Sequence, residues 1–191
     1  PHLTTALTGP LLELEAYFLR HQARIEAWLR AQWRHTPPPF YCSVDIRNSG
    51  YKVAPVDTNL FPAGFNNLNP AFLPLCIQAA QSAVERVCPS ARQLLLVPES
   101  HTRNTYYLES LATLCEILAK AGFDVRIGSL LEISEPQTVT LPSGRVLRLE
   151  PIIRKNNAIG VAEFWPCMVL LNNDLSSGVP DILRGLEQPV M

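Results

Sequence analysis

The 191-residue sequence lacks the patterns that most quickly place a protein in a functional class. It has no GxGxxG or GxxxxGK[ST] loop for phosphates, no HExxH pair for zinc and no GxSxG nucleophile motif. It also lacks runs of like charge, since 16 Lys and Arg residues balance 17 Asp and Glu residues. Because nonspecific binding to a phosphate backbone needs clustered basic residues, the composition excludes nucleic acid as an expected partner.

Signals for export and membrane attachment are also missing. No basic segment followed by an apolar one opens the chain, and no lipidation motif closes it. The stretch from Thr58 to Val84 carries no charge and is long enough for a membrane span, but it contains many prolines and asparagines. These residues predict a buried loop followed by a helix. We therefore expect a soluble, cytoplasmic protein with no membrane partner.

Cysteine is present without the spacing of a disulfide framework or a structural metal site. An odd number of cysteines with no CxxC pair favours unpaired, apolar core residues in a reducing compartment. We therefore predict neither disulfides nor metal ligands in this chain. The five residues are Cys42, Cys76, Cys88, Cys115 and Cys167.

The spacing of apolar residues predicts an α/β fold with an open, mostly parallel sheet and flanking helices, a long N-terminal amphipathic helix and an inserted β-hairpin. The first helix is expected to begin after Thr8 as its N-cap and to end before three consecutive prolines at 37–39. This divides the chain into a helical segment, 1–39, and an α/β substrate-binding domain, 40–191. The stripe containing Trp28 and Trp33 predicts a core or an interface.

The later residues alternate between helix and strand, which predicts a right-handed parallel unit. Two continuous apolar runs, Leu94–Val97 and Met168–Leu171, are typical of strands covered on both faces. Gly122 is expected to close a helix in the left-handed conformation. The other expected elements are strands at 41–46, 51–56 and 125–127, helices at 73–87, 107–118 and 180–186, and a hairpin with strands 139–141 and 146–149.

Two of these strands run into loops that are rich in polar residues. Residues 98–104 follow the strand at 94–97, and residues 172–178 follow the strand at 168–171. Since ligands of open α/β sheets bind beyond the carboxyl ends of the strands, these loops predict a binding site.

The alternative for these loops is helix capping. Thr102 or Asn104 would cap one helix, and Asp174 or Ser177 the next. Capping explains only one or two residues of each loop, which favours a binding site. His101 lies beside a helix start, where a capping or orienting role is commoner than general-base catalysis.

A third polar segment combines opposite charges at alternating positions. Residues two apart on a strand share a face. The side chains of Asp45 and Arg47 are therefore expected to point the same way, as are those of Asp57 and Asn59. A carboxylate beside a guanidinium suits an amino acid, because the first binds the ammonium and the second binds the carboxylate. The alternative is a cross-strand salt bridge, worth less than about 1 kcal/mol when exposed.

The uncharged loop that follows this segment supports the binding interpretation. Asn66 and Asn67 stand near Gly64 in a stretch expected to be buried. Buried carboxamides must find hydrogen-bond partners, and a polar ligand would supply them.

Two blocks of the sequence resemble a bacterial family of glutamate–cysteine ligases. The first is SVDIRNSGYKVAPVDTNLFPAGFNNL at 43–68, and the second is PESHTRNTYYLES at 98–110. The likeness covers most of residues 40–175 and concerns the amino-terminal part of the family. Neither Pro1 nor Met191 looks like a natural terminus, so we expect a fragment.

The resemblance implies an ATP-grasp ligase that joins the γ-carboxyl of glutamate to the amine of cysteine, the first step of glutathione synthesis. MgATP would phosphorylate the γ-carboxylate, and the amine would attack the acyl phosphate. Glutamate, cysteine and ATP are the implied partners, with ATP and Mg²⁺ held mainly by parts of the family that follow this chain. The fragment alone is therefore expected to be inactive.

The resemblance and the residue patterns together define a candidate site. Arg47, Lys52 and Arg103 are the expected catalytic cations, because they can hold a carboxylate or a transferring phosphoryl group. Asp45 and Asp57 are expected to hold the ammonium. The remaining predicted substrate-binding residues are Asn59, Asn66, Asn67, Glu99, His101, Thr102, Asn104, Asn172 and Asn173.

Two other functions remain open at this stage. One is a non-catalytic amino-acid-binding or regulatory domain without nucleotide chemistry. It would bind its ligand through the same side chains, Asp45, Asp57 and Arg47, which we call the charged clamp. The other is a dimerisation domain built on the helix with Trp28 and Trp33, and a homo-oligomer is compatible with either of them.

Overall fold

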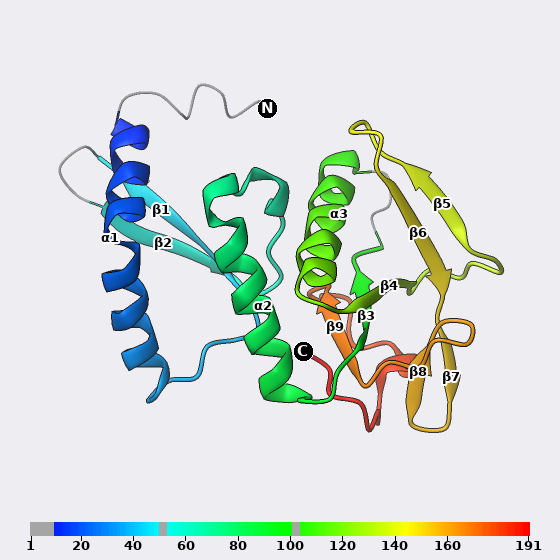
Figure 1. The fold of residues 1–191 in the computed structure, drawn as a ribbon. Helices are drawn as coiled ribbons and strands as arrows, with labels where there is room; N and C mark the ends of the chain where they lie inside the picture. The colour runs from blue at the N-terminus through cyan, green and yellow to red at the C-terminus, as the bar shows by residue number, and fades with distance from the viewer. Residues whose placement is uncertain (1–9, 50–52, 101–103) are drawn as a thin grey trace. The chain divides into compact units, whose positions relative to one another are not determined.

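The computed structural model describes residues 10–49, 53–100 and 104–191 of the chain (Figure 1). The expected N-cap Thr8 and the turn residue Gly50 lie outside these ranges. The chain forms two compact units, residues 1–39 with 44–58, and residues 40–43 with 59–191. Residues 44–58, which we expected in the second domain, therefore belong to the unit that contains the N-terminal helix.

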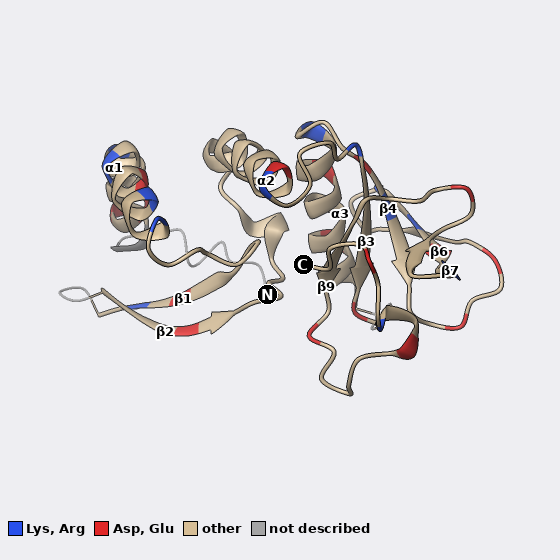
Figure 2. Cartoon of the chain, turned by 90° about the horizontal axis from the view of Figure 1, so that it is seen from below, with Lys and Arg blue, Asp and Glu red and all other residues tan. Residues whose placement is uncertain are grey.

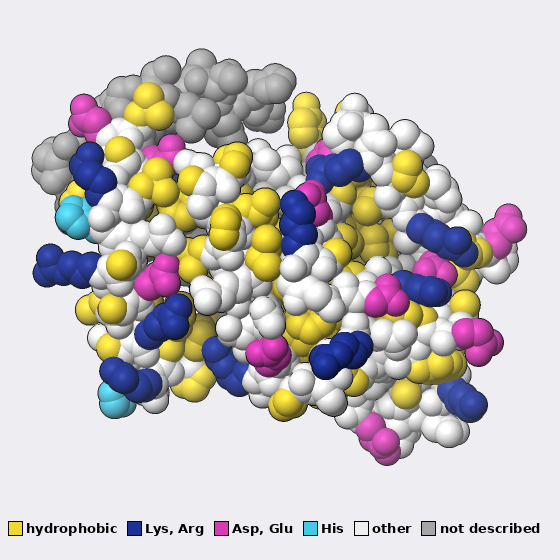
Figure 3. Space-filling view, in the orientation of Figure 1, with side chains coloured by type: hydrophobic (Ala, Val, Ile, Leu, Met, Phe, Trp, Pro, Cys, Tyr) yellow, Lys and Arg dark blue, Asp and Glu magenta, His cyan; other side chains and the backbone are white. Residues whose placement is uncertain are grey.

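The first unit consists of one long helix and a two-stranded sheet. Helix α1 (Pro10–Trp33) confirms the long N-terminal helix, and β1 (Ser43–Asn48) pairs with β2 (Val53–Asn59). None of the side chains described in these three elements is fully buried. Trp28 is 61% exposed, and other hydrophobic side chains also remain visible at the surface (Figure 3). The described part of this unit therefore provides no core for the tryptophan stripe.

The second unit is built on a five-stranded sheet with the order β5-β6-β4-β3-β9. Strand β3 is parallel to β4 and β9, β4 is parallel to β6, and only β5 is antiparallel to its neighbour β6. This confirms the predicted mostly parallel α/β sheet. The strands are β3 (Gln93–Pro98), β4 (Asp124–Ser129), β5 (Gln137–Thr140), β6 (Val146–Pro151) and β9 (Met168–Asn172).

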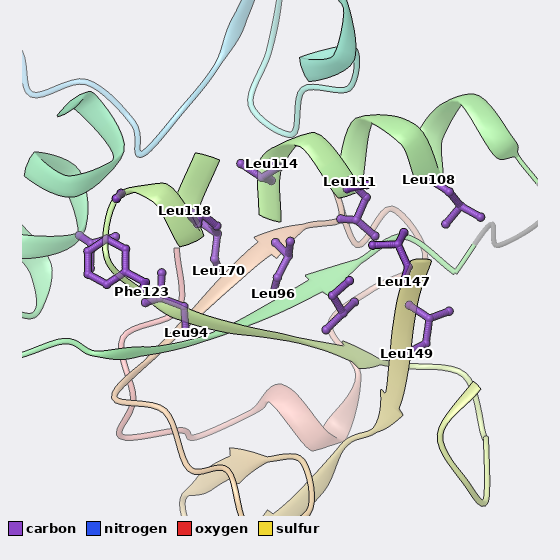
Figure 4. Close-up of a cluster of buried hydrophobic side chains, with 14 of the residues drawn as sticks. Leu94, Leu96, Leu108, Leu111, Leu114, Leu118, Phe123, Leu147, Leu149 and Leu170 are labelled. Atoms are coloured by element: carbon purple, nitrogen blue, oxygen red, sulfur yellow. The ribbon is translucent and has the colours of Figure 1, made fainter. Parts of the chain in front are cut away.

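Both faces of the central strands are covered, as the continuous apolar runs predicted. Side chains alternate along a strand. Leu94 and Leu96 accordingly belong to the cluster under helices α2 (Leu73–Val87) and α3 (Thr105–Lys120), as Figure 4 shows for α3. Leu95 and Val97 belong to a second cluster on the opposite face. That face is covered by β8 (Ala158–Gly160) and the segment that follows it, together with the short 3-10 helix Asp181–Leu183.

Helix α3 begins and ends beside two residues that the sequence marked as helix ends, Asn104 and Gly122. The Asn104 side chain accepts hydrogen bonds from the amides of Tyr106 and Tyr107, so Asn104 is the N-cap. Gly122 has φ +96° after the helix, the left-handed conformation expected there. The β5–β6 hairpin also has the predicted turn, in which Gly144 donates its amide hydrogen to the Leu141 carbonyl.

The structure differs from the expectations in three places. Residues 153–160 form an unpredicted hairpin, β7 (Ile153–Lys155) and β8 (Ala158–Gly160), with Asn156 in the turn at φ +55°. The helix expected at 180–186 is a three-residue 3-10 turn, Asp181–Leu183, because the chain leaves helical geometry at once on both sides. Pro180 stands at its N-cap position, so neither Asp174 nor Ser177 caps a helix here.

The expected burial of Asn66 and Asn67 was wrong, and the expected burial of the cysteines is only partly confirmed. The loop at 61–69 has Pro62 buried, but Asn66 and Asn67 are exposed to solvent. Their carboxamides are open to water and therefore need no buried partners. Among the cysteines, Cys42 is exposed and the other four are half-buried, and of these Cys88, Cys115 and Cys167 pack against the hydrophobic core.

The described helices give no sign of a membrane span. None of them is both long enough and apolar enough to cross a bilayer.

Candidate functional site

The two polar loops predicted from the sequence start side by side. Strands β3 and β9 are parallel neighbours, and Pro98 at the end of β3 is in register with Asn172 at the end of β9. Their carboxyl ends therefore meet at one edge of the sheet, where ligands of open α/β folds bind. We take this edge, with the loop at 59–69, as the candidate site.

Tyr107 links the two strand ends. Its hydroxyl lies 2.9 Å from Asn172 Oδ1 and 3.0 Å from the Asn172 carbonyl oxygen, so its single proton is donated to this residue. The same hydroxyl oxygen accepts a hydrogen bond of 2.9 Å from the Glu99 amide. One buried phenol thus holds the residue after β3 and the last residue of β9 in a fixed relationship.

Asn172 is buried and its carboxamide is fully engaged within the protein. Its Nδ2 donates to the Pro62 carbonyl at 3.0 Å and to the Tyr41 hydroxyl at 3.3 Å. The Tyr41 hydroxyl in turn donates to the Leu171 carbonyl. Because both amide hydrogens and the Oδ1 atom have protein partners, this geometry supports a positioning role for Asn172.

Asn173 fixes the start of the second loop. Its Nδ2 donates to the Pro98 carbonyl at 3.1 Å, and its Oδ1 accepts from the Leu175 amide at 2.9 Å. Leu175 adopts φ +51°, an uncommon conformation for a branched side chain. The Asn173 carboxamide thus spans both strand ends and supports the turn beyond β9.

Ser110 connects the loop at 59–69 to helix α3. Its buried hydroxyl oxygen accepts hydrogen bonds from the amides of Gly64 and Phe65, at 2.8 and 3.1 Å. Gly64 has φ +91°, which L side chains rarely adopt. A glycine on the loop and a small hydroxyl residue on the helix are therefore both needed for this attachment.

Burial keeps both phenols of the site protonated. It raises the pKa of Tyr41 to about 12, against a smaller lowering by Asn172. Burial likewise raises the pKa of Tyr107, against a smaller lowering by the amide of Glu99. At neutral pH these hydroxyls act as hydrogen-bond donors, and neither is available as a general base.

The predicted residues of the loop after β3 are only partly described. Glu99 is half-buried, and Asn104 caps α3, as the capping alternative proposed for it. Three further predicted residues, His101, Thr102 and Arg103, lie outside the described ranges. Asp174, in the other loop, is exposed, and its Oδ1 accepts a hydrogen bond from the Ser176 amide.

The expected charged clamp lies in the first unit. Asp45 and Arg47 alternate with apolar residues on β1, and Asp57 lies on β2 (Figure 2). All three are exposed, and no ion pair joins Asp45 to Arg47 in this described strand. Lys52 lies outside the described residues. The convergence of this clamp with the strand ends of the second unit stays a prediction.

The end of β2 has a local structural explanation. Asn59 Oδ1 accepts a hydrogen bond of 2.8 Å from the Phe61 amide, and Asp57 Oδ1 accepts one of 2.9 Å from the Thr58 amide. Such local bonds favour turns over continued strand.

A separate cavity of about 450 Å³ lies between β4 and β6. It is lined by Asp124 at the start of β4, and these strands pair only from Ile127 onward. The buried Glu150 carboxylate lies 3.6 Å from Arg126 and 3.7 Å from Arg148. Because the cavity includes the amino end of β4, it is distinct from the predicted edge of the sheet.

The described residues contain no group of three or more His, Cys, Asp or Glu side chains placed to hold a metal ion. No residue of the described chain is therefore assigned to Mg²⁺.

Sequence reasoning missed Tyr41, Tyr107 and Ser110, the residues that organise the strand ends. Tyr107 was expected only as the first residue of the helix at 107–118. A signal was nevertheless available, because a buried tyrosine usually needs a partner for its hydroxyl.

Comparison with known proteins places this architecture in a family. The glutamate-cysteine ligase family matches residues 15–191. The chain belongs to the glutamate-cysteine ligase family. Its residues also match a crystal structure from Methylobacillus flagellatus KT, of a protein provisionally named gamma-glutamylcysteine synthetase, at 60% identity with a TM-score of 0.81. The comparison with curated proteins finds no match.

The Methylobacillus flagellatus protein is longer than this chain. The match covers 100% of the chain described here and 45% of that protein. The chain thus corresponds to a little under half of its structural relative.

Proposed function

We propose that this chain is part of an ATP-dependent ligase that joins the γ-carboxyl of L-glutamate to the amine of L-cysteine. The observation that carries the proposal is the family match over residues 15–191, supported by 60% identity to a gamma-glutamylcysteine synthetase homologue. Within the chain, the edge formed by β3 and β9 is the proposed place for an amino-acid substrate.

The residues have different proposed roles. Asp45 and Asp57 would bind the ammonium of an amino acid, and Arg47 its carboxylate, by charge-assisted hydrogen bonds. Tyr107, Asn172 and their partners would position the backbone of the two loops, because their polar atoms already bond to one another. The polar residues exposed on those loops would then face a rigid edge.

ATP would supply the phosphoryl group that activates the γ-carboxylate. The described residues hold neither a glycine-rich phosphate loop nor a carboxylate cluster for Mg²⁺. We therefore assign no nucleotide contact to them. A cytoplasmic location also remains part of the proposal.

The experiment is a product assay with glutamate, cysteine and MgATP. The chain and the longer Methylobacillus flagellatus protein are assayed in parallel, with γ-glutamylcysteine and ADP both quantified. The proposal predicts that the longer protein forms both in equal amounts, and that omission of cysteine or glutamate stops γ-glutamylcysteine formation. A longer protein that is folded, binds glutamate and forms no γ-glutamylcysteine would contradict it and would favour an amino-acid-binding domain.

A further inference from the structure

Two half-buried cysteines are in direct contact although they lie 79 residues apart in the sequence. The Sγ atoms of Cys88 and Cys167 are 2.6 Å from each other. Cys88 is the C-cap residue of α2, and Cys167 immediately precedes β9. Both side chains pack against the same hydrophobic cluster, which holds the two sulfur atoms in place.

We propose that Cys88 and Cys167 are a thiol–disulfide exchange site, which forms a reversible intramolecular disulfide by reaction with a small-molecule disulfide such as glutathione disulfide. This inference does not depend on the proposed ligase function. A disulfide bond is about 2.05 Å long, so these sulfur atoms need to approach by only about half an ångström. Side-chain adjustment at the ends of two elements suffices for such a movement.

The exchange balances without any further reactant. The Cys88 thiolate attacks one sulfur of glutathione disulfide, forms a mixed disulfide and releases one glutathione thiolate. The Cys167 thiolate then attacks the Cys88 sulfur and releases the second glutathione thiolate. The two protein thiols are oxidised, glutathione disulfide is reduced to two thiols, and the two protons lost by the protein are taken up by the released thiolates.

The surroundings of the Cys167 sulfur favour its reaction in the second step. Burial, and then the adjacent Cys88 sulfur, raise the pKa of Cys167 to about 11. The Cys167 thiolate is therefore disfavoured in the reduced pair, and Cys167 reacts second, when the mixed disulfide on Cys88 is already in contact with it. Both residues are half-buried, so the pair is not sealed inside the core.

The other cysteines offer a comparison within the same chain. Cys42 is exposed, so it can form only a mixed disulfide with glutathione unless a second molecule supplies a thiol. Burial raises the pKa of Cys115 to about 12, which disfavours its thiolate. In the described chain, Cys88 and Cys167 are the one pair of cysteines recorded in contact.

The disulfide would connect the candidate site to the opposite end of its strand. Cys167 precedes the first residue of β9, and Asn172 is the last residue of β9. A bond from Cys167 to the end of α2 would restrict the movement of β9, the strand whose last residue, Asn172, accepts the hydrogen bond from Tyr107. A stabilising effect is expected because the link closes a long loop of the unfolded chain.

The test is a thiol map of the whole chain after incubation with glutathione disulfide. Remaining thiols are alkylated, and the protein is digested without reduction and analysed by mass spectrometry. The proposal predicts a cross-linked pair of peptides containing Cys88 and Cys167, and glutathione on Cys42. The melting temperature should rise by about 5–10 °C and return after treatment with dithiothreitol.

Two variants provide the controls. Cys76→Ser should retain the cross-link, because Cys76 is half-buried and lies in α2, whose C-cap is Cys88, but outside the pair. Cys88→Ser should remove both the cross-link and the rise in melting temperature. Alkylation of both Cys88 and Cys167 in the wild-type chain, or separate mixed disulfides on each, would overturn the proposal even if a variant failed to fold.

Discussion

The hydroxyl of Tyr107 lies 2.9 Å from Asn172 Oδ1, and this contact joins helix α3 to the last residue of strand β9. The same hydroxyl accepts the Glu99 amide hydrogen beyond the neighbouring strand β3. A single buried side chain therefore holds the two strand ends at which the sequence predicted a site.

The first prediction concerns this phenol. Tyr107→Phe leaves the Glu99 amide and Asn172 Oδ1 without their hydroxyl partner. The free energy of unfolding should therefore fall by about 1–3 kcal/mol. Urea denaturation followed by circular dichroism measures the change. The control is Tyr106→Phe, since Tyr106 is 70% exposed and its substitution should cost less than about 0.5 kcal/mol. Equal stability of the two variants would show that the Tyr107 contact does not hold the strand ends.

The second prediction concerns the ion pair between α3 and the β5–β6 turn. Glu109 Oε2 lies 2.5 Å from an Arg145 nitrogen and also accepts from the Ser143 hydroxyl at 2.9 Å. Burial acts to raise the pKa of Glu109, but Arg145 and Ser143 outweigh it and bring the pKa below its usual value. The charged carboxylate therefore stabilises the folded state.

The pH dependence follows from the sign of this shift. The contribution of Glu109 should be fully present above the usual carboxyl pKa of about 4.3 and be lost as the pH falls through its lowered value. Glu109→Gln should lower the free energy of unfolding by about 1 kcal/mol at pH 7. Under acid conditions the free energies of unfolding of variant and wild type should differ by less. Thermal unfolding between pH 3 and pH 7 measures this, and a difference that is constant with pH would contradict it.

The third prediction tests the packing on the second face of the sheet. A Cβ atom at Gly160 would lie 2.3 Å from the Phe164 backbone oxygen, whereas one at Gly128 would meet mainly the Ile152 side chain at 2.7 Å. Backbone atoms move less easily than the end of a side chain. Gly160→Ala should therefore lower the free energy of unfolding by about 3 kcal/mol and Gly128→Ala by about 1 kcal/mol. The reverse order in denaturant unfolding would show that β8 is packed differently.

The central sheet could be predicted from the sequence because its signals are local. Leu94–Val97 and Met168–Leu171 are apolar at every position, and such runs need cover on both faces. Likewise, Asn104 and Gly122 mark the ends of α3 through their own backbone chemistry. The β7–β8 hairpin was missed because each strand is only three residues long, too short for a periodic pattern.

The candidate site was predictable only as two polar loops at strand ends. The contacts of Tyr41 and Tyr107 with Asn172 span 131 and 65 residues, and nothing in local spacing indicates such pairs. The contact between Cys88 and Cys167 was missed for the same reason. Family resemblance indicated the reaction, but not the roles of individual residues.

The account depends most on the prediction that this chain binds an amino acid through Arg47. Isothermal titration of the chain with glutamate tests it directly, with Arg47→Ala as the variant and Arg24→Ala, on an exposed position of α1, as the matched control. We predict that the wild type and Arg24→Ala bind glutamate equally and that Arg47→Ala binds it about ten- to a hundredfold more weakly. Absence of glutamate binding by the wild type, or unchanged affinity in Arg47→Ala, would contradict the account.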